Sequence, residues 1–121
     1  MLNCLMVGIG GFIGTVCRYL IGLLHIDTHS GFPVKTLIIN IAGSFFIGLI
    51  TALAAKNKGL NEQVVLMLKV GVCGGFTTFS TFAYESTDLL KSGHVAIALI
   101  YVCTSIILGV LAVFAAQMLV R

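Results

Sequence analysis

Four long apolar stretches, joined by short polar connections, make up most of the sequence. Each carries few charges and is long enough to cross a bilayer as a helix, for which about 20 mostly apolar residues suffice. The stretches cover residues 2–24, 33–55, 62–90 and 95–120. This pattern predicts an all-α membrane protein, with four transmembrane helices per subunit in a single domain.

The third stretch contains a segment that is poorly suited to a continuous helix. Gly74 and Gly75 each lower helix stability by about 1 kcal/mol, and the hydroxyl residues that follow can bond backbone groups in non-helical ways. A break is therefore predicted at 74–78. An unpaired backbone group is costly in lipid, so protein, water or an ion must meet the freed groups, which indicates a protein interior.

Polar residues form a narrow stripe along one face of the second stretch. They recur at three- and four-residue steps: Thr36, Asn40, Gly43 and Ser44. The amide of Asn40 needs partners inside the membrane, and these are either a neighbouring helix or a passing solute. The fourth stretch has a weaker stripe at four-residue spacing, formed by Tyr101, Ser105 and Gly109.

The first stretch combines glycines with one cation. Gly10 and Gly14 form a small-residue pair, which in membranes lets another helix approach closely. Arg18 costs about 2.5 to 3.5 kcal/mol inside a span, so it either pairs with a group in the protein or extends to the headgroups from its place near one end. The sequence alone leaves both alternatives open.

Composition excludes a soluble domain and gives no sign of catalysis. Hydrophobic residues make up 59% of the chain and charged residues 9%, and the net charge of +3 is scattered, which gives no case for nucleic-acid binding. No Ser/His/Asp set or phosphate loop stands in a plausible context, so we do not expect an enzyme. With no basic leader or small-residue cleavage site, the first stretch is expected to be a retained span.

Two groups of potential metal ligands have simpler interpretations. Four cysteines lie inside apolar runs without ligand spacing and are interpreted as small packing residues: Cys4, Cys17, Cys73 and Cys103. His25, Asp27 and His29 stand in the first connection, where a polar loop explains them and a metal site is the less favoured alternative.

Lysine and arginine are divided almost evenly between the two ends of the predicted bundle. If the spans alternate, one side receives Lys56, Lys58, Lys69 and Arg121. The other side receives Arg18, Lys35 and Lys91. Because orientation follows an excess of these residues on one side, a near-tie predicts mixed insertion. Two copies inserted in opposite senses can then pair about a two-fold axis in the membrane plane.

The polar groups inside the spans suit ions rather than chemical conversion. Glu62, Glu85 and Asp88 are all placed near segment ends, so no span is expected to hold a buried carboxylate. The positive rims of Phe79 and Phe82 can flank a small anion while amide and hydroxyl groups donate hydrogen bonds. Carbonyls freed at the break can separately hold Na⁺. Aromatic core packing is the alternative for the phenylalanines.

Three motifs together resemble the Fluc (CrcB) family of small fluoride channels. The longest is GGFTTFSTFAYE at 74–85, and it is supported by GGFIG at 10–14 with Arg18-Tyr19 and by TLIINIAGSF at 36–45. The resemblance covers the whole chain in order. It implies a dual-topology, antiparallel homodimer in the cell (inner) membrane, with two fluoride pores along the subunit interface.

The same resemblance assigns roles to individual residues. It implies a fluoride pathway formed by Asn40, Phe79, Phe82, Ser80, Thr81, Tyr101, Ser105 and Thr36. Arg18 would lie in a vestibule, and backbone carbonyls of Gly74 and Thr77 from both subunits would hold a structural Na⁺ at the dimer centre. Lys35 departs from the family, which commonly has glycine before the Thr-Leu motif, and is expected to alter electrostatics at the mouth of the pathway.

Two other functions remain as alternatives. One is a proton-coupled exporter of cationic compounds of the small four-span multidrug type, against which the expected lack of a mid-span carboxylate counts. The other is a structural subunit of a larger membrane complex, in which the polar stripes only join helices.

Overall fold

The computed structural model describes residues 1–26 and 28–121, and this part of the chain contains helices and turns but no strand. Four helical segments are long and apolar enough to cross a membrane: Leu2–Gly22, Val34–Lys56, Glu62–Lys91 and Val95–Leu119. The predicted all-α fold with four spans is confirmed, and the chain is a multi-pass membrane protein. Asp27, one of the three potential metal ligands of the first connection, lies outside the described residues.

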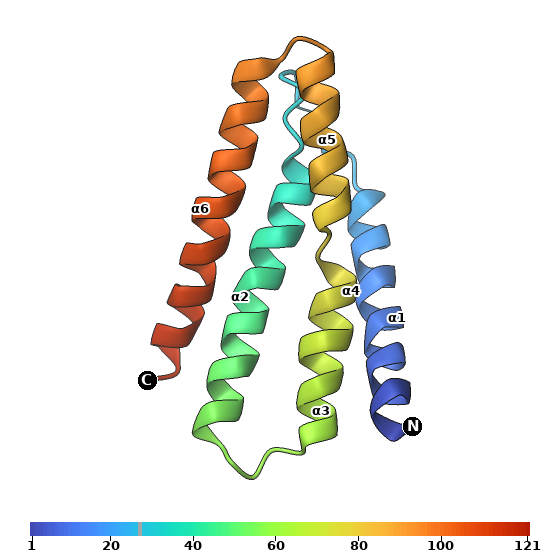
Figure 1. Ribbon diagram of the computed structural model, residues 1–121, viewed down its shortest axis with the longest axis vertical. Coiled ribbons are helices and arrows are strands. Elements are labelled where there is room, and N and C mark those ends of the chain that lie inside the picture. The colour runs from blue at the N-terminus through green and yellow to red at the C-terminus, as the bar shows by residue number, and fades with distance from the viewer. Residues whose placement is uncertain (27) are drawn as a thin grey trace.

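Three of the spans are single helices and the third is composite. The single helices are α1 (Leu2–Gly22), α2 (Val34–Lys56) and α6 (Val95–Leu119). The third span consists of α3 (Glu62–Leu66), the π-helical η1 (Met67–Cys73), α4 (Gly74–Phe76) and α5 (Phe79–Lys91). Figure 1 shows these pieces end to end, with an extended link between α4 and α5.

The third span is broken as predicted, but the two glycines do not form the break. Gly74 is helical, with φ −65° and ψ −39°, whereas Thr77 and Thr78 are extended, with ψ 155° and 110°. The hydroxyl of Thr78 accepts a hydrogen bond from the N–H of Thr81 at 3.2 Å and so caps α5. The competing bonds of the hydroxyl residues therefore set the position of the break.

Glycines on both helices bring α1 close to the third span. A Cβ atom on Gly71 would lie 2.7 Å from a carbonyl oxygen of α1, and one on Gly75 would lie 2.6 Å from another. Cβ atoms on Gly10 or Gly14 would meet the backbone of η1 in the same way. The predicted packing face of the first span is confirmed, because only glycine permits this approach.

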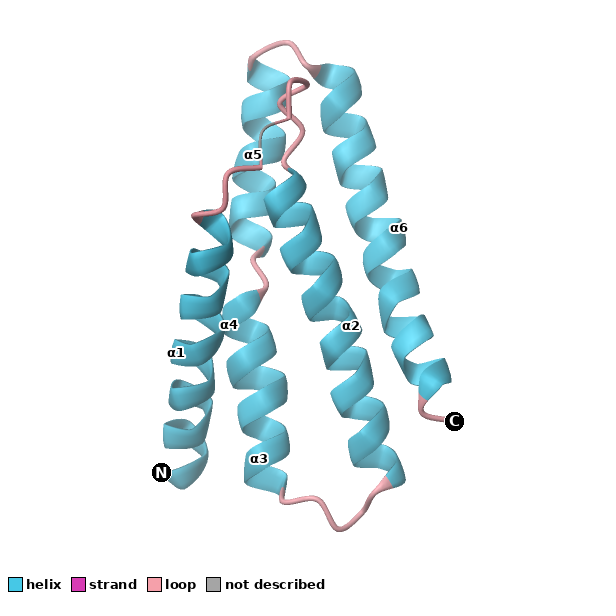
Figure 2. Cartoon of the chain, turned by 180° about the vertical axis from the view of Figure 1, so that it is seen from behind, coloured by secondary structure: helices cyan, strands magenta, loops and turns pink. Residues whose placement is uncertain are grey.

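The four spans form two packed pairs. Helix α1 lies along η1 and α4, and α2 lies along α6, while α1 and α2 have little direct contact. Figures 1 and 2 show α1 and α6 at the outer sides, with α2 and the third span between them. Where α5 meets α6, a small apolar core contains Leu89, Ala98 and Tyr101. Two cavities, described below, lie between the two pairs.

Candidate functional site

The amide of Asn40 on α2 satisfies the backbone at the break. Its Oδ1 accepts a hydrogen bond from the N–H of Thr78 at 2.8 Å, and its Nδ2 donates to the carbonyl oxygen of the same residue at 3.1 Å. Both backbone groups of Thr78 are thereby paired inside the membrane, as a broken span requires. Asn40 thus has an interhelical partner, and its amide carries one further N–H.

Two side chains of α1 bond the carbonyl that precedes the break. Nε of Arg18 donates to the carbonyl oxygen of Gly75 at 3.1 Å, and Oγ1 of Thr15 donates to the same oxygen at 3.4 Å. In a continuous helix this oxygen would accept from the N–H of Phe79. Of the two alternatives for Arg18, pairing inside the protein is the one that the structure contains.

A neutral space, here called the first cavity, lies between α2, the third span and α6 and has a volume of about 370 Å³. Its lining consists of Asn40, Gly43, Ser44, Ile47, Cys73, Gly74, Thr77, Phe79, Phe82, Ser105 and Ile106. None of these residues is charged. Oγ of Ser105 is buried and has no hydrogen-bond partner among the described residues, so the cavity is bordered by a hydroxyl that still requires one.

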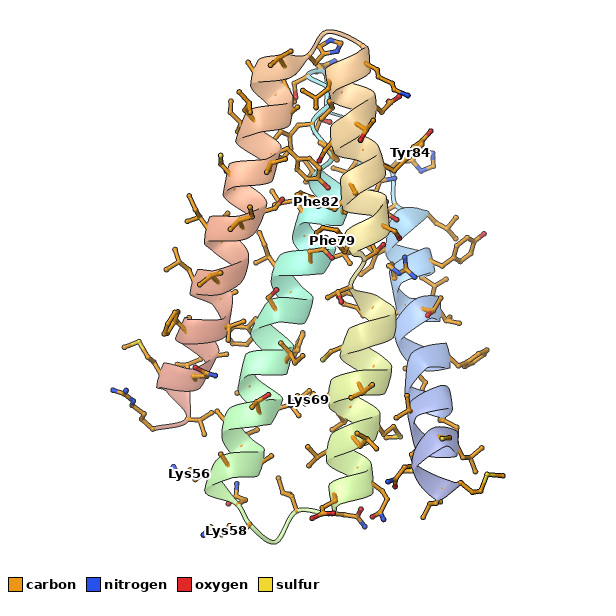
Figure 3. The ribbon with its side chains drawn as sticks, viewed as in Figure 1. Lys56, Lys58, Lys69, Phe79, Phe82 and Tyr84 are labelled. Carbon is orange, nitrogen blue, oxygen red and sulfur yellow. The ribbon has the colours of Figure 1, made fainter. Side chains whose placement is uncertain are left out.

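Aromatic rings continue from the first cavity into the core. The ring centroids of Phe79 and Phe82 are 5.8 Å apart, and those of Phe82 and Tyr101 are 5.1 Å apart. Figure 3 shows Phe79 and Phe82 on the side of α5 that faces α2 and α6, with Tyr84 on the other side. Phe79 is 79% exposed although it lines the cavity, so the cavity opens to the subunit surface beside this ring.

A charged space, here called the second cavity, lies between α1, α2 and α5 and has a volume of about 350 Å³. Its polar lining consists of Arg18, Lys35, Thr36, Thr78, Thr81 and Glu85. Of the residues that the structure describes, two cations and one carboxylate therefore line this cavity. Nζ of Lys35 donates a hydrogen bond to the carbonyl oxygen of Gly22, the last residue of α1, at 2.9 Å.

Glu85 lies inside the bundle, which corrects its expected place near a segment end. Its Oε1 accepts a hydrogen bond from Oγ1 of Thr36 at 2.6 Å, and its Oε2 accepts one from the hydroxyl of Tyr101 at 2.9 Å. Thr36 is 6% exposed and Tyr101 is fully buried. Glu85 is three residues from Phe82 and four from Leu89, so helical periodicity along α5 would have placed it on the inward face.

The structure divides the predicted pathway residues between the two cavities. The first cavity receives Asn40, Phe79, Phe82 and Ser105, together with the expected sodium ligands Gly74 and Thr77. The second receives Thr36, Thr81 and Arg18. Ser80 is exposed, with Oγ 3.4 Å from the hydroxyl oxygen of Thr78, and Tyr101 lines neither cavity.

Sequence reasoning missed Thr78 as well as Glu85. Thr78 is 8% exposed, caps α5 and binds Asn40, so it connects three elements of the site. Its position directly before an apolar helical segment is the signal for an N-cap residue. The four cysteines are free, and no cluster of three potential metal ligands occurs in the described part of the chain.

Comparison with known proteins gives consistent matches. The model of the family described as "CrcB-like protein, Camphor Resistance (CrcB)" matches residues 5–117. A protein of Chlorobaculum tepidum named "Fluoride-specific ion channel FluC" is 42% identical over 121 residues, which cover 100% of this chain and 96% of the relative. A relative of the same name from Ruminiclostridium cellulolyticum is 42% identical, covering 100% of this chain and 94% of the relative.

Proposed function

The chain belongs to the CrcB-like protein family, and from this premise we propose that it is a passive, fluoride-selective ion channel. The relatives named as fluoride-specific channels support fluoride as the ion. The channel would lower cytoplasmic fluoride from its place in the cell membrane, the inner membrane where there are two. It would do so without a chemical step, since an open channel only lets the ion move down its electrochemical gradient.

The observation that carries the proposal is the lining of the first cavity. A buried hydroxyl, the amide of Asn40 and two phenylalanine rings meet there. Within the described chain, that hydroxyl has no hydrogen-bond partner and no carboxylate lines the cavity. Fluoride is small and strongly hydrated, so it needs donors that replace water in a narrow space. Amide and hydroxyl groups supply N–H and O–H, and the positive rims of Phe79 and Phe82 add weaker attraction.

The polar residues between the cavities would complete the route. Oxygens of Thr36 and Tyr101 meet at Glu85, while Thr81 and Ser80 follow the break on the first turn of α5. We assign these residues to a track of hydroxyl groups that leads from the second cavity to the phenylalanines. Tyr101 acts on this track through Glu85, to which its hydroxyl donates.

An antiparallel homodimer would provide the missing wall of the pathway. The first cavity opens beside the exposed ring of Phe79, and a second copy of the chain would close it there. The charge count supports mixed insertion. Figure 3 shows Lys56 and Lys58 near the turn between α2 and α3. Lys35 and Lys91 lie at the other end of the bundle, on the first turn of α2 and the last turn of α5.

The residues near the break fit a structural Na⁺. Gly74 and Thr77 line the first cavity. In the described chain, none of the backbone hydrogen bonds of turns, loops and helix caps goes to the carbonyl oxygen of Gly74 or Thr77. Such carbonyls at a broken helix are suitable ligands for a hard cation. A bound Na⁺ would hold the two copies of the break together at the dimer centre.

Fluoride efflux from proteoliposomes tests the proposed function. Vesicles containing only the purified protein are loaded with potassium fluoride or potassium chloride, and a potassium ionophore starts the flux. The proposal expects rapid loss of fluoride and retention of chloride. Absence of fluoride loss from folded, dimeric protein would contradict it, whereas fluoride loss alone excludes a purely structural subunit.

A proton gradient applied in the same vesicles distinguishes the exporter. The expected lack of a carboxylate within the spans counted against a proton-coupled exporter. Glu85 does lie within the bundle, between Thr36 and Tyr101, so this objection no longer holds. A channel conducts fluoride whether or not protons are driven across the membrane. Uptake of an organic cation that requires the proton gradient would instead favour the exporter.

A further inference from the structure

Lys35 lines the second cavity from the first turn of α2, in a geometry that suits an ion-attracting group. It is the second residue of α2, is half-buried, and lines the cavity together with Arg18 and Glu85. Its ammonium group donates one hydrogen bond, to the carbonyl oxygen of Gly22. An ammonium group has three donors, so two N–H bonds remain for water or an ion.

The contact with Gly22 fixes the charge in place. A free lysine side chain samples many rotamers, and its charge spreads over the surface. Here the carbonyl at the end of α1, where the helix dipole is negative, anchors the ammonium group at 2.9 Å. The anchor keeps a positive charge in the cavity that Thr36 and Thr81 also line.

The charge is needed there because the cavity also holds a carboxylate. Glu85 opposes the approach of an anion, and Nε of Arg18 is engaged by the carbonyl oxygen of Gly75. Among the described residues, the cavity has two cations against one carboxylate with Lys35 and one against one without it. A net positive cavity with apolar walls raises the local concentration of anions.

We propose that Lys35 is an anion-gathering residue of this channel: its anchored ammonium group draws fluoride into the second cavity and so sets the rate of access to the hydroxyl track. This inference rests on the proposed function and concerns access alone, because Lys35 lies outside the first cavity. Lys35 therefore affects how fast fluoride arrives and not which ion passes.

Fluoride efflux at two ionic strengths separates this role from a structural one. Lys35→Gln removes the charge but keeps a group that can donate to Gly22, Lys35→Arg keeps the charge, and Lys35→Glu reverses it. At 0.01 M of a large impermeant salt on both sides, charges act over about 30 Å, and at 1 M over about 3 Å. We expect Lys35→Gln to slow efflux about three- to tenfold at low salt and to match the wild type at high salt.

Two matched controls isolate the position and the contact. Lys91→Gln removes a lysine from the same end of the subunit but outside both cavities, so it shifts the topology count equally. Lys56→Gln removes a lysine that also donates to a backbone carbonyl, that of Val120 at 3.0 Å. Both controls should retain wild-type efflux at both salt concentrations, and so should Lys35→Arg. Efflux through Lys35→Glu should be slower than through Lys35→Gln.

Each result supports or overturns the proposal. Three results would overturn it while leaving the fluoride channel intact. The first is equal efflux of the wild type and Lys35→Gln at low salt, and the second is slower efflux of Lys35→Gln that persists at high salt. The third is equally slow efflux of Lys91→Gln. Failure of the wild type to carry fluoride would overturn both. If Lys35→Gln does not assemble, Lys35→Met, which keeps the apolar stem, takes its place with the same expected salt dependence.

Discussion

The two cavities on either side of the break differ chiefly in charge. The first is lined by neutral groups and aromatic rings, and by a buried hydroxyl that has no partner among the residues described. The second contains Arg18, Lys35 and Glu85. Both reach the same two-residue break, since Thr77 lines the first and Thr78 the second. One interruption of a helix therefore separates two environments with different electrostatics.

This difference in charge suggests that the two cavities have different roles in ion passage. Fixed charges act over long distances and gather ions, but they distinguish poorly between fluoride and chloride. Neutral donors act only at contact distance, where the size of the ion decides how well they replace its water shell. We therefore assign access to the second cavity and selection to the first. The following substitutions test this assignment, beginning with the largest expected effect.

Placing a charge in the neutral cavity should have the largest effect. Asn40→Asp removes the N–H that binds the carbonyl of Thr78 and adds a negative charge to the lining of the first cavity. Two like charges 4 Å apart repel by about 4 kcal/mol at an effective dielectric constant of 20, so we expect fluoride efflux to fall at least about 100-fold.

Asn57→Asp is the matched control for this change. Asn57 also donates from its amide to a backbone carbonyl, that of Leu53 at 3.2 Å, but it is exposed at the end of α2. This variant should conduct like the wild type. Normal efflux in Asn40→Asp, with assembly intact, would place Asn40 off the ion path and refute the assignment of selection to the first cavity.

Removing an aromatic rim should have the next largest effect. Phe79→Ile keeps apolar bulk at the opening of the first cavity but removes the positive ring edge, and we expect efflux to fall about tenfold while the dimer still forms. Phe114→Ile, at an exposed phenylalanine outside both cavities, should leave efflux unchanged. Parallel loss of dimer and efflux in Phe79→Ile, measured by gel filtration and by fluoride electrode, would favour a packing role.

Removing the hydroxyl of Tyr101, which bonds Glu85, should affect stability more than fluoride flux. Tyr101→Phe deletes the donor to Glu85 and keeps the ring packed against Phe82. A hydrogen bond to a charged group contributes about 1.5 to 3 kcal/mol, so thermal unfolding in detergent should shift to lower temperature. Efflux should fall by at most about threefold. A loss comparable to that of Asn40→Asp would instead place this hydroxyl in direct contact with the ion.

Changing charges outside both cavities should leave conduction by assembled protein unchanged but alter insertion. Adding lysines at the turn between α2 and α3, as Asn57→Lys with Gly59→Lys, changes the balance between the two ends from four against three to six against three. Reporter fusions to the C-terminus should then shift from mixed orientation towards one orientation. Unchanged mixed insertion would contradict the use of the charge count, although it would leave the two cavities as described.

Long-range regularity made much of the fold predictable. The four apolar stretches appear as helices whose ends lie within two residues of the expected bounds, because bilayer thickness fixes their length. Within the stripe, Thr36, Asn40 and Gly43 contact the third span and Ser44 lines the first cavity, as their shared helical face predicts. Local competition was harder to resolve. Intrinsic propensity pointed to Gly74 and Gly75, but capping by Thr78 set the break, and Gly75 instead contacts α1.

The charged cavity was less predictable than the neutral one. Neutral stripes follow from the spacing within single helices, whereas the second cavity depends on how α1, α2 and α5 meet. Glu85 looked peripheral by its distance along the chain, yet its partners come from α2 and α6. The link between Lys35 and Gly22 spans two helices and the connection between them, and no periodic pattern encodes it.

The reversal potential of the wild-type protein in a planar bilayer tests whether fluoride passes in preference to chloride. A tenfold gradient of fluoride is imposed across the membrane with equal chloride on both sides. If the first cavity selects fluoride, the current should reverse at the fluoride equilibrium potential, about 59 mV from zero. Reversal near zero would mean that chloride passes freely. That result, or the absence of any fluoride current from folded protein, would contradict the account.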